Sequence, residues 1–339
     1  MRTEYLSSAP SDLQRAADLL KAGELVAIPT ETVYGLAADA LNGEAVAAIF
    51  AAKGRPADNP LIVHIAAVSE WERLVSHIPP QALALAEAFW PGPLTMILPK
   101  TDLIPNEVSA GLSTVAVRMP SHPIARELIA LSGCPLAAPS ANRSGIPSPT
   151  EAKRVAEDMD GRIAAVVDGG TCDVGVESTV IDLSTTPPRL LRPGAVTVEM
   201  LTAVIGEIAV DDAVVQPLKS GRAAASPGMK YKHYAPKAKV ILVKGDKNAF
   251  VDYVNAHAAD GVAALCFDGE ETGLCIPYFT YGARDDHAAQ AHHVFEVLRR
   301  LDEQHVRIAY TACPSQDGVG LAVYNRLLRA AGFEVIVLE

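Results

Sequence analysis

Residues 53–64 read Lys-Gly-Arg-Pro-Ala-Asp-Asn-Pro-Leu-Ile-Val-His. The preceding residues, 45–52, carry apolar side chains at helical spacing, which predicts the end of a helix. Gly54 and Pro56 end it, because glycine favours the position just past a helix and proline cannot continue one. Residues 61–65 are apolar and β-branched, which predicts a strand. The stretch therefore joins a helix to a strand, as the alternating layers of an α/β fold require.

The loop in this stretch displays two cations and an amide, Lys53, Arg55 and Asn59, and His64 follows in the strand. Two interpretations are open. Cations on a surface loop are ordinarily solvated. Alternatively, Lys53 as a point charge and Arg55 as a planar fork bind a phosphate or a carboxylate. The remainder of the chain decides between these interpretations.

The hydrophobic pattern predicts two α/β domains, at residues 1–210 and 239–339, joined by a basic linker at 211–238. In the first domain it predicts strands at 24–29, 61–65, 94–98, 114–119, 135–138, 164–168, 178–183 and 189–191, with helices at 80–90, 123–131, 150–159 and 197–205. In the second, strands at 240–243, 262–267, 276–280, 306–310 and 333–338 alternate with helices at 247–257, 287–301 and 319–330. Such alternation predicts a parallel sheet.

Length and composition are those of a globular protein. The 339 residues suffice for two domains, and the chain is 49% hydrophobic and 20% charged. It lacks an 18-residue apolar run and a signal segment at its start, so we expect a cytoplasmic protein without membrane contact. Its five cysteines form no C-x-x-C pair. Reduced thiols are therefore expected rather than a disulfide framework or a zinc module.

Charge is distributed unevenly along the chain. Residues 1–215 carry 15 basic and 26 acidic residues, a net of −11, whereas residues 216–238 carry five basic residues and no acidic one. An acidic body binds nucleic acid poorly, because phosphate contacts supply most of the non-specific affinity. We therefore expect no strong direct binding of tRNA. Cations concentrated near polar loops suit a small anionic ligand better.

Two further loops are rich in hydroxyl and amide groups. Residues 29–36 contain two threonines, and in the simpler interpretation Thr30 or Thr32 caps a following helix. Residues 138–150 are interrupted by glycine and proline and can offer backbone N–H groups to an anion. The chain contains neither a G-x-x-x-x-G-K-[ST] nor a G-x-G-x-x-G phosphate loop.

The linker at 211–238 has no periodicity, and its simpler interpretation is a passive tether. It nevertheless contains Tyr231, His233 and Tyr234, which can stack on or hydrogen-bond to a nucleotide. Together with its cations and its hinge-forming glycines and prolines, these residues favour a lid that excludes water from a site.

Nine short motifs occur in order along the first two thirds of the chain. They are Pro29-Thr-Glu-Thr-Val-Tyr-Gly-Leu36, Lys53-x-Arg55, Asn59-Pro-Leu-Ile-Val-His64, Phe89-Trp-Pro-Gly-Pro-Leu-Thr95, Val115-Ala-Val-Arg-Met-Pro120, Pro139-Ser-Ala-Asn-x-Ser-Gly145, Glu177-Ser-Thr179, Arg192-Pro-Gly194 and Ser226-Pro-Gly-Met-x-Tyr-x-His-Tyr-Ala-Pro236. Each is weak alone, but nine in register are specific. Together they resemble the YrdC-like threonylcarbamoyl-AMP synthases, in the long form with a C-terminal Rossmann-like domain.

The resemblance implies a fold and a reaction. The fold is a twisted α/β sheet domain with an open cavity, followed by a smaller parallel α/β domain. The reaction is a nucleotidyl transfer, in which L-threonine, bicarbonate or CO₂, and ATP give L-threonylcarbamoyl-AMP and pyrophosphate. This is the first step of threonylcarbamoyl-adenosine modification of tRNA, and a separate transferase then receives the product. Mg²⁺ is implied with ATP, mainly through the phosphates and with unknown protein ligands.

The resemblance also implies roles for individual residues. For L-threonine it implies Thr32, His64, Arg118, Ser178 and a backbone contact of Ala138. For ATP it implies Arg55, Asn59, Thr114, Ser140, Asn142, Arg192 and Tyr234. Lys53 and Arg55 are the implied catalytic pair, with Lys53 and Asn142 completing a split Lys53-x-Arg55 and Ser140-x-Asn142 signature around the phosphates.

Two other classes of protein share part of this pattern. A non-catalytic RNA-binding module would present a broad basic face, and the acidic first domain argues against one. Hydrogenase-maturation carbamoyltransferases use a similar domain, but they add zinc-type cysteine pairs, and this sequence contains none.

Overall fold

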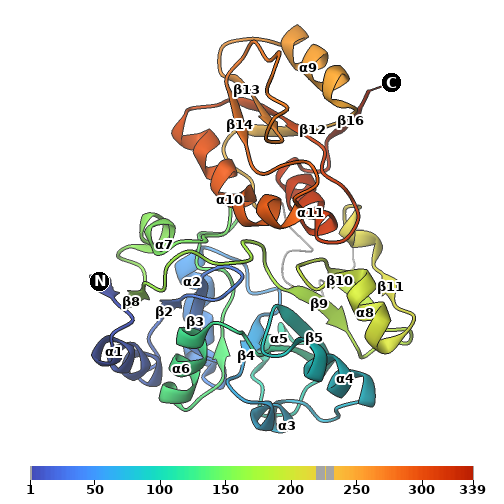
Figure 1. The fold of residues 1–339 in the computed structure, drawn as a ribbon. Coiled ribbons are helices and arrows are strands. Elements are labelled where there is room, and N and C mark those ends of the chain that lie inside the picture. Colours follow the sequence, from blue (N-terminus) through green and yellow to red (C-terminus); the bar gives the residue numbers. More distant parts are fainter. Residues whose placement is uncertain (1, 219–225, 227–232, 339) are drawn as a thin grey trace.

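The computed structural model describes residues 2–218, 226 and 233–338, which form two α/β domains (Figure 1). The first is built on an eleven-stranded sheet and the second on a five-stranded sheet. The first sheet ends in sequence at Val210, and the second begins at Lys239. Within the described part of the chain, no helix combines the length and apolarity needed to cross a bilayer.

The first sheet is mixed, and its spatial order departs from sequence order. Its strands lie in the order β1 (Glu4–Leu6), β8 (Ala165–Val167), β2 (Val26–Ile28), β3 (Gly35–Asp39), β7 (Leu136–Ala137), β4 (Ile62–His64), β6 (Thr114–Arg118), β5 (Leu94–Pro99), β9 (Thr179–Asp182), β10 (Arg189–Arg192) and β11 (Ala209–Val210). Strands β4 and β6 are parallel, and their register pairs His64 with Arg118. Two residues that are 54 positions apart thus become neighbours on one sheet face.

Helices cover both faces of this sheet. They are α1 (Pro10–Lys21), α2 (Gly43–Lys53), α3 (Trp71–Leu74), α4 (Pro80–Phe89), α5 (Asn106–Ser109), α6 (Pro123–Ser132), α7 (Ala152–Met159) and α8 (Val198–Ile205), with 3₁₀ turns at Val68–Glu70 and Asp212–Val214. In β2, Val26 and Ile28 belong to one buried cluster and Ala27 to another, as the alternation of side chains along a strand requires. A strand buried on both faces is apolar along its whole length, as β2 is.

Helix α2 ends as the sequence predicts, but one residue later than expected. Gly54 adopts a left-handed backbone with φ of 62° and closes the helix. Lys53 is therefore the last residue of α2 and not a loop residue, which corrects the placement expected from the sequence. This difference decides where its ammonium group points.

The polar turn after β2 leads into a strand and not into a helix. Thr30 Oγ1 donates to the carbonyl of Val33 at 2.6 Å, and the chain then enters β3, which pairs antiparallel with β2. The interpretation of Thr30 or Thr32 as a helix cap is therefore wrong. The hydroxyl groups close a turn between two strands instead.

The second sheet is entirely parallel, as predicted. Its order is β14 (Tyr278–Thr280), β13 (Val262–Cys266), β15 (Ile308–Ala312), β12 (Lys239–Lys244) and β16 (Val335–Val337), with helices α9 (Lys247–Ala256), α10 (His287–Glu303) and α11 (Gly320–Ala330). Figure 1 shows α10 and α11 on the side that faces the first domain and α9 on the other side of the sheet.

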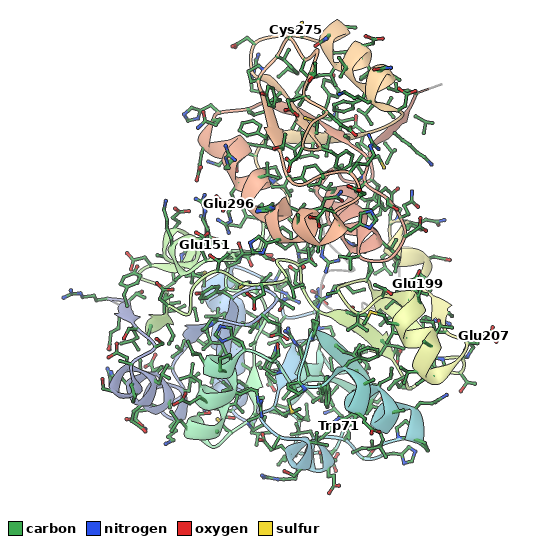
Figure 2. All side chains as sticks on the ribbon, viewed as in Figure 1. Trp71, Glu151, Glu199, Glu207, Cys275 and Glu296 are labelled. Atoms are coloured by element: carbon green, nitrogen blue, oxygen red, sulfur yellow. The ribbon has the colours of Figure 1, made fainter. Side chains whose placement is uncertain are left out.

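The two domains are packed together closely. Val33 and Val176 of the first domain belong to the same buried cluster as the core of the second. Gly175 lies so near α10 that a Cβ there would come within 2.4 Å of His292 Cα. Figure 2 shows Glu296 on α10 between the domains, where it forms an ion pair with Arg154 of α7. The second domain is therefore held against the part of the first that carries the polar loops.

Candidate functional site

A pocket opens where the polar loops meet, with about 600 Å³ of empty space that includes part of the open solvent. Nine of the residues predicted from the sequence line it: Thr32, Arg55, His64, Arg118, Ala138, Ser140, Ser178, Arg192 and Tyr234. They come from six separate stretches of the first domain and from the end of the linker. The pocket is also lined by Thr30, Val33, Gly35, Ile62, Pro139, Glu177 and His233.

Arg118, at the end of β6, is held in place from three sides. Its Nη1 donates to Thr32 Oγ1 at 2.9 Å, its Nη2 lies 2.8 Å from Glu31 Oε1, and its Nε donates to the carbonyl of Gly92 at 3.4 Å. Both side chains of the ion pair are almost fully buried. Burial alone would raise the pKa of Glu31, but the Arg118 charge and hydrogen bond outweigh it and hold that pKa below its usual value. The pair is therefore charged at neutral pH.

His64 lies beside Arg118 and is neutral. Burial, reinforced by the positive charge of Arg118, lowers the pKa of His64 to about 3. Its Nδ1 lies 3.2 Å from the carbonyl oxygen of Ile62, which fixes the ring. A neutral imidazole next to a guanidinium can orient a polar ligand without adding a second charge.

Acidification is expected to remove stability through His64. Its pKa is about 3 in the folded state and near 6.5 in an unfolded chain, so the unfolded state binds more protons between these values. The contribution of His64 to the free energy of unfolding is complete above pH 6.5. It falls by about 1.4 kcal/mol for each pH unit below that value. Thermal midpoints at pH 7, 6 and 5 should therefore fall less steeply for His64→Gln than for wild type. His293→Gln, at an exposed position, is the control, and equal slopes for His64→Gln and wild type would contradict the expectation.

Ser178 and Arg192 form a second hydrogen-bonded group in the pocket wall. Arg192 donates from Nε to the Ser178 carbonyl at 2.9 Å and from Nη2 to Ser178 Oγ at 3.0 Å. Ser178 Oγ also lies 2.8 Å from Thr95 Oγ1. Burial lowers the pKa of Arg192 to about 10, which leaves it a cation at neutral pH. A preorganised cation beside two hydroxyls suits a phosphate.

Lys53 is not among the described residues that line the pocket, but its ammonium group supports the pocket wall. Its Nζ donates to the carbonyl oxygens of Ser140 and Asn142, the latter at 2.7 Å. Burial, followed by the charge of Arg55, lowers the pKa of Lys53 well below its usual value. Lys53 thus fixes the loop at 138–145, which carries Ser140 into the pocket.

Asn59 and Asn142 are buried behind the pocket as well. With its amide oriented to satisfy both neighbours, Asn59 accepts from Arg55 Nη2 at 3.1 Å and donates to the Ser226 carbonyl at 3.1 Å. Asn142 Nδ2 donates to the carbonyls of Arg143 and Ile146. Both amides therefore shape loops in this structure, and direct ATP contact by either remains a prediction.

Thr114 is not brought to the pocket wall. It begins β6, four positions before Arg118, and is partly buried. Both side chains belong to the same sheet face, because they are an even number of positions apart. The described pocket lining does not include Thr114, and its contact with ATP stays a prediction.

The end of the linker contributes two aromatic rings to the pocket. His233 and Tyr234 line it, and burial, reinforced by the charge of Arg55, lowers the pKa of His233 to about 3. Tyr234 is 5% exposed, and its ring lies 5.1 Å from that of Phe295 on α10. Tyr231 and most of the linker cations, Lys219, Arg222, Lys230 and Lys232, lie outside the described residues, so the predicted lid stays a prediction.

Several residues of the site were not predicted from the sequence. Glu31 and Glu177 lie inside two of the nine motifs, at 29–36 and 177–179. Their place in these motifs could have indicated that the two carboxylates have a role in the site. Their partners, Arg118 and Arg326, are far away along the chain. Only the fold shows that these carboxylates are paired with buried arginines.

Two family models match consecutive parts of the chain. A model described as "Telomere recombination" matches residues 18–194, and one described as "Threonylcarbamoyl-AMP synthase, C-terminal domain" matches residues 196–332. Among curated relatives, the chain is 49% identical to Threonylcarbamoyl-AMP synthase of Pyrococcus abyssi, covering 95% of this chain and 94% of the relative. It is 46% identical to the protein of that name from Bacillus subtilis, covering 98% and 97%.

One solved structure is similar to this chain over its whole length. The crystal structure of P. abyssi Sua5 complexed with L-threonine is 44% identical, with a TM-score of 0.93 and 100% of both chains covered. This similarity extends over both domains. It favours the synthase over the two alternatives, an RNA-binding module and a hydrogenase-maturation carbamoyltransferase. With both domain models matched and relatives alike along nearly their full length, the chain belongs to the threonylcarbamoyl-AMP synthase family.

Proposed function

We propose that this pocket joins L-threonine, CO₂ or bicarbonate, and ATP to form L-threonylcarbamoyl-AMP and pyrophosphate. One observation carries the proposal: three arginines from different segments of the chain, Arg55, Arg118 and Arg192, line one pocket. Arg118 lies with His64 at the ends of β4 and β6, and Arg55 and Arg192 line other parts of the wall. A carboxylate and a polyphosphate can therefore be bound in one cavity at the same time.

L-Threonine fits the Arg118 side. The carboxylate of L-threonine binds the Arg118 guanidinium, which contacts with Thr32 and Glu31 already hold in position. Its hydroxyl and amino groups then meet Thr32, Ser178 and the backbone of Ala138. The amine must be neutral to attack CO₂, and neutral His64 adds no charge that would oppose this. With CO₂, the N–C bond forms as one C=O π bond breaks, and the nitrogen loses a proton to water to give the carbamate. With bicarbonate, the same carbamate forms with loss of one water molecule.

The second step is transfer of the adenylyl group. A carbamate oxygen attacks the α-phosphorus of ATP, a new O–P bond forms, and the bond to the β-phosphate oxygen breaks to release pyrophosphate. Two anions must approach each other, so Arg55 and Arg192 contribute by neutralising charge and by positioning. No covalent intermediate on the protein is needed, and the product anhydride needs a site from which water is excluded.

Mg²⁺ fits this pocket as a partner of ATP. Glu177 is the one acidic residue in the described lining, and its two carboxylate oxygens are already held by Ser148 and Arg326. The described residues contain no group of three or more His, Cys, Asp or Glu side chains placed to hold a metal. The ATP phosphates would thus supply most of the ligands, and the ion would neutralise phosphate charge.

The product is passed to a separate transferase that modifies tRNA, and the acidic body of this chain fits an enzyme that does not itself bind tRNA tightly. We place the enzyme in the cytoplasm. All five cysteines are described and are free thiols, which suits a reducing compartment.

The test is mass spectrometry of the product. Purified protein is mixed with L-threonine, bicarbonate, ATP and Mg²⁺, and parallel samples omit one component each. Threonylcarbamoyl-AMP and pyrophosphate should form only in the complete mixture. Nucleotide turnover that does not depend on threonine would contradict the proposal.

Arg118 is expected to select a free carboxylate. L-Threonine amide keeps the amine and the hydroxyl but lacks the negative charge, so it should be a poor substrate for wild type. We expect kcat/KM to fall at least about tenfold, since charge-assisted hydrogen bonds contribute about 1.5–3 kcal/mol. Pyrophosphate release with each compound is the measurement. Equal rates for threonine and its amide would assign Arg118 a different task.

A further inference from the structure

Arg326, on α11 of the second domain, is fully buried and directed at the first domain. Its Nε donates to Glu177 Oε2 at 2.8 Å and its Nη2 to the Glu177 carbonyl at 3.1 Å. Its Nη1 donates to the Pro193 carbonyl at 2.9 Å. All three nitrogens thus bind two short segments of the other domain.

Those two segments are part of the pocket wall. Glu177 precedes Ser178, and Pro193 follows Arg192, while Ser178 and Arg192 are joined by two hydrogen bonds. The backbone here is tightly packed, since a Cβ on Gly194 would come within 2.5 Å of Thr179 N. One guanidinium therefore ties together the residues that flank Ser178 and Arg192.

The same guanidinium also supports the linker end. Its Cζ lies 5.6 Å from the centre of the Tyr234 ring, and Phe295 of α10 lies on that ring as well. Tyr234 has a positive φ of 62°, an uncommon backbone conformation for a tyrosine. Packing against the second domain thus holds the ring that lines the pocket.

Arg326 further balances charge next to the pocket. Burial alone would raise the pKa of Glu177, but the charges of Arg326 and Arg192 and the Ser148 hydrogen bond hold it below its usual value. Glu177 is therefore an anion in the pocket wall. Without Arg326, this negative charge would be less compensated beside a bound polyphosphate.

Other buried arginines join the domains elsewhere. Arg154 of α7 pairs with Glu296 and Glu303 of α10, and Arg299 of α10 pairs with Asp158 of α7. The described pocket lining includes none of these residues. Arg154 and Arg299 thus hold the domains together away from the pocket, whereas Arg326 binds segments of the pocket wall.

We propose that Arg326 is a positioning residue of the reaction: from the second domain, it fixes Ser178, Arg192 and Tyr234 in the geometry that ATP requires. The second domain is then part of the catalytic machinery and not only an appended fold. This inference rests on the proposed function of the pocket. It assigns Arg326 no contact with substrate.

The experiment compares Arg326→Met with Arg154→Met in the full chain. Both changes remove a buried arginine that bridges the domains, so Arg154→Met reports what loss of interface stability does by itself. Pyrophosphate release is measured against ATP and against threonine, together with thermal midpoints. We expect Arg326→Met to lower kcat/KM for ATP about a hundredfold, the scale of misplacing reacting groups by about 1 Å. Arg154→Met should stay within about twofold of wild type.

Arg326→Lys tests the planar guanidinium of Arg326 separately from its positive charge. Lysine keeps the cation but cannot bind Glu177 and Pro193 in one plane, so we expect an intermediate kcat/KM for ATP at a near-normal thermal midpoint. If Arg326→Met does not fold, Arg326→Lys carries the test alone. Wild-type kinetics in Arg326→Lys, or the same kinetics in Arg326→Met and Arg154→Met, would overturn the proposal. Inactivity of wild type would overturn the proposed function instead, so the two failures are distinguishable.

Discussion

Arg55→Ala is expected to lower the rate of pyrophosphate release about a hundredfold, the scale of losing one preorganised charge contact in a transition state. The Arg55 guanidinium is nearly buried in the pocket wall, lies 5.7 Å from the centre of the Phe50 ring and donates to Asn59. It is thus positioned before any substrate arrives. Alanine leaves the charge that develops on the departing pyrophosphate without this partner.

Lys53→Ala is expected to cause a similar loss by a different route. The change removes the donor to the Ser140 and Asn142 carbonyls and frees the loop that carries Ser140. Arg143→Ala is the control for both variants, because Arg143 is an exposed cation on that loop. Rates near wild type in Arg55→Ala would show that it does not contact the transition state.

Arg118→Met is expected to destabilise the first domain by about 3–5 kcal/mol, because removing one partner of a buried pair leaves an uncompensated charge. The charge is that of Glu31, which is 5% exposed and 2.8 Å from the guanidinium. Adding Glu31→Gln to Arg118→Met removes the charge, so the double variant should regain most of the lost stability. Urea unfolding of the wild type, both single variants and the double variant measures this.

Activity should not return with stability. The double variant still lacks a guanidinium for the threonine carboxylate, so its kcat/KM for threonine should stay at least about a hundredfold below wild type. A fold that is restored without activity separates the structural task of Arg118 from its binding task. A double variant no more stable than Arg118→Met would show that Glu31 is not the unpaired charge.

Local sequence was a poor guide where neighbouring strands determine the structure. Strand β3 has the sequence Gly-Leu-Ala-Ala-Asp, without a β-branched or aromatic residue, and no strand was predicted there. It is extended because it pairs with β2 on one side and β7 on the other. The two threonines before it suggested a helix cap for the same reason, because the partner strands are not visible from the sequence.

The structure brings the four signature residues close together, but it places only two of them in the pocket lining. Arg55 and Ser140 line the pocket, whereas Lys53 and Asn142 lie behind it. A spacing of two residues cannot distinguish these positions, because Lys53 ends a helix and Arg55 follows a left-handed glycine. The change of backbone direction at Gly54 decides which cation reaches the pocket.

The sequence by itself determined most of the local elements and the types of chemical group on the loops. Gly54 ends α2, alternating apolar segments produce the parallel second sheet, and hydroxyl, amide and cationic groups mark the loops that the fold brings to one pocket. Only the tertiary structure decided which carboxylate meets which guanidinium. Arg326 lies 149 positions from Glu177, and no local spacing relates them. Their contact results from the packing of α11 against the first domain, because burying apolar surface between the domains brings together side chains that are distant in sequence.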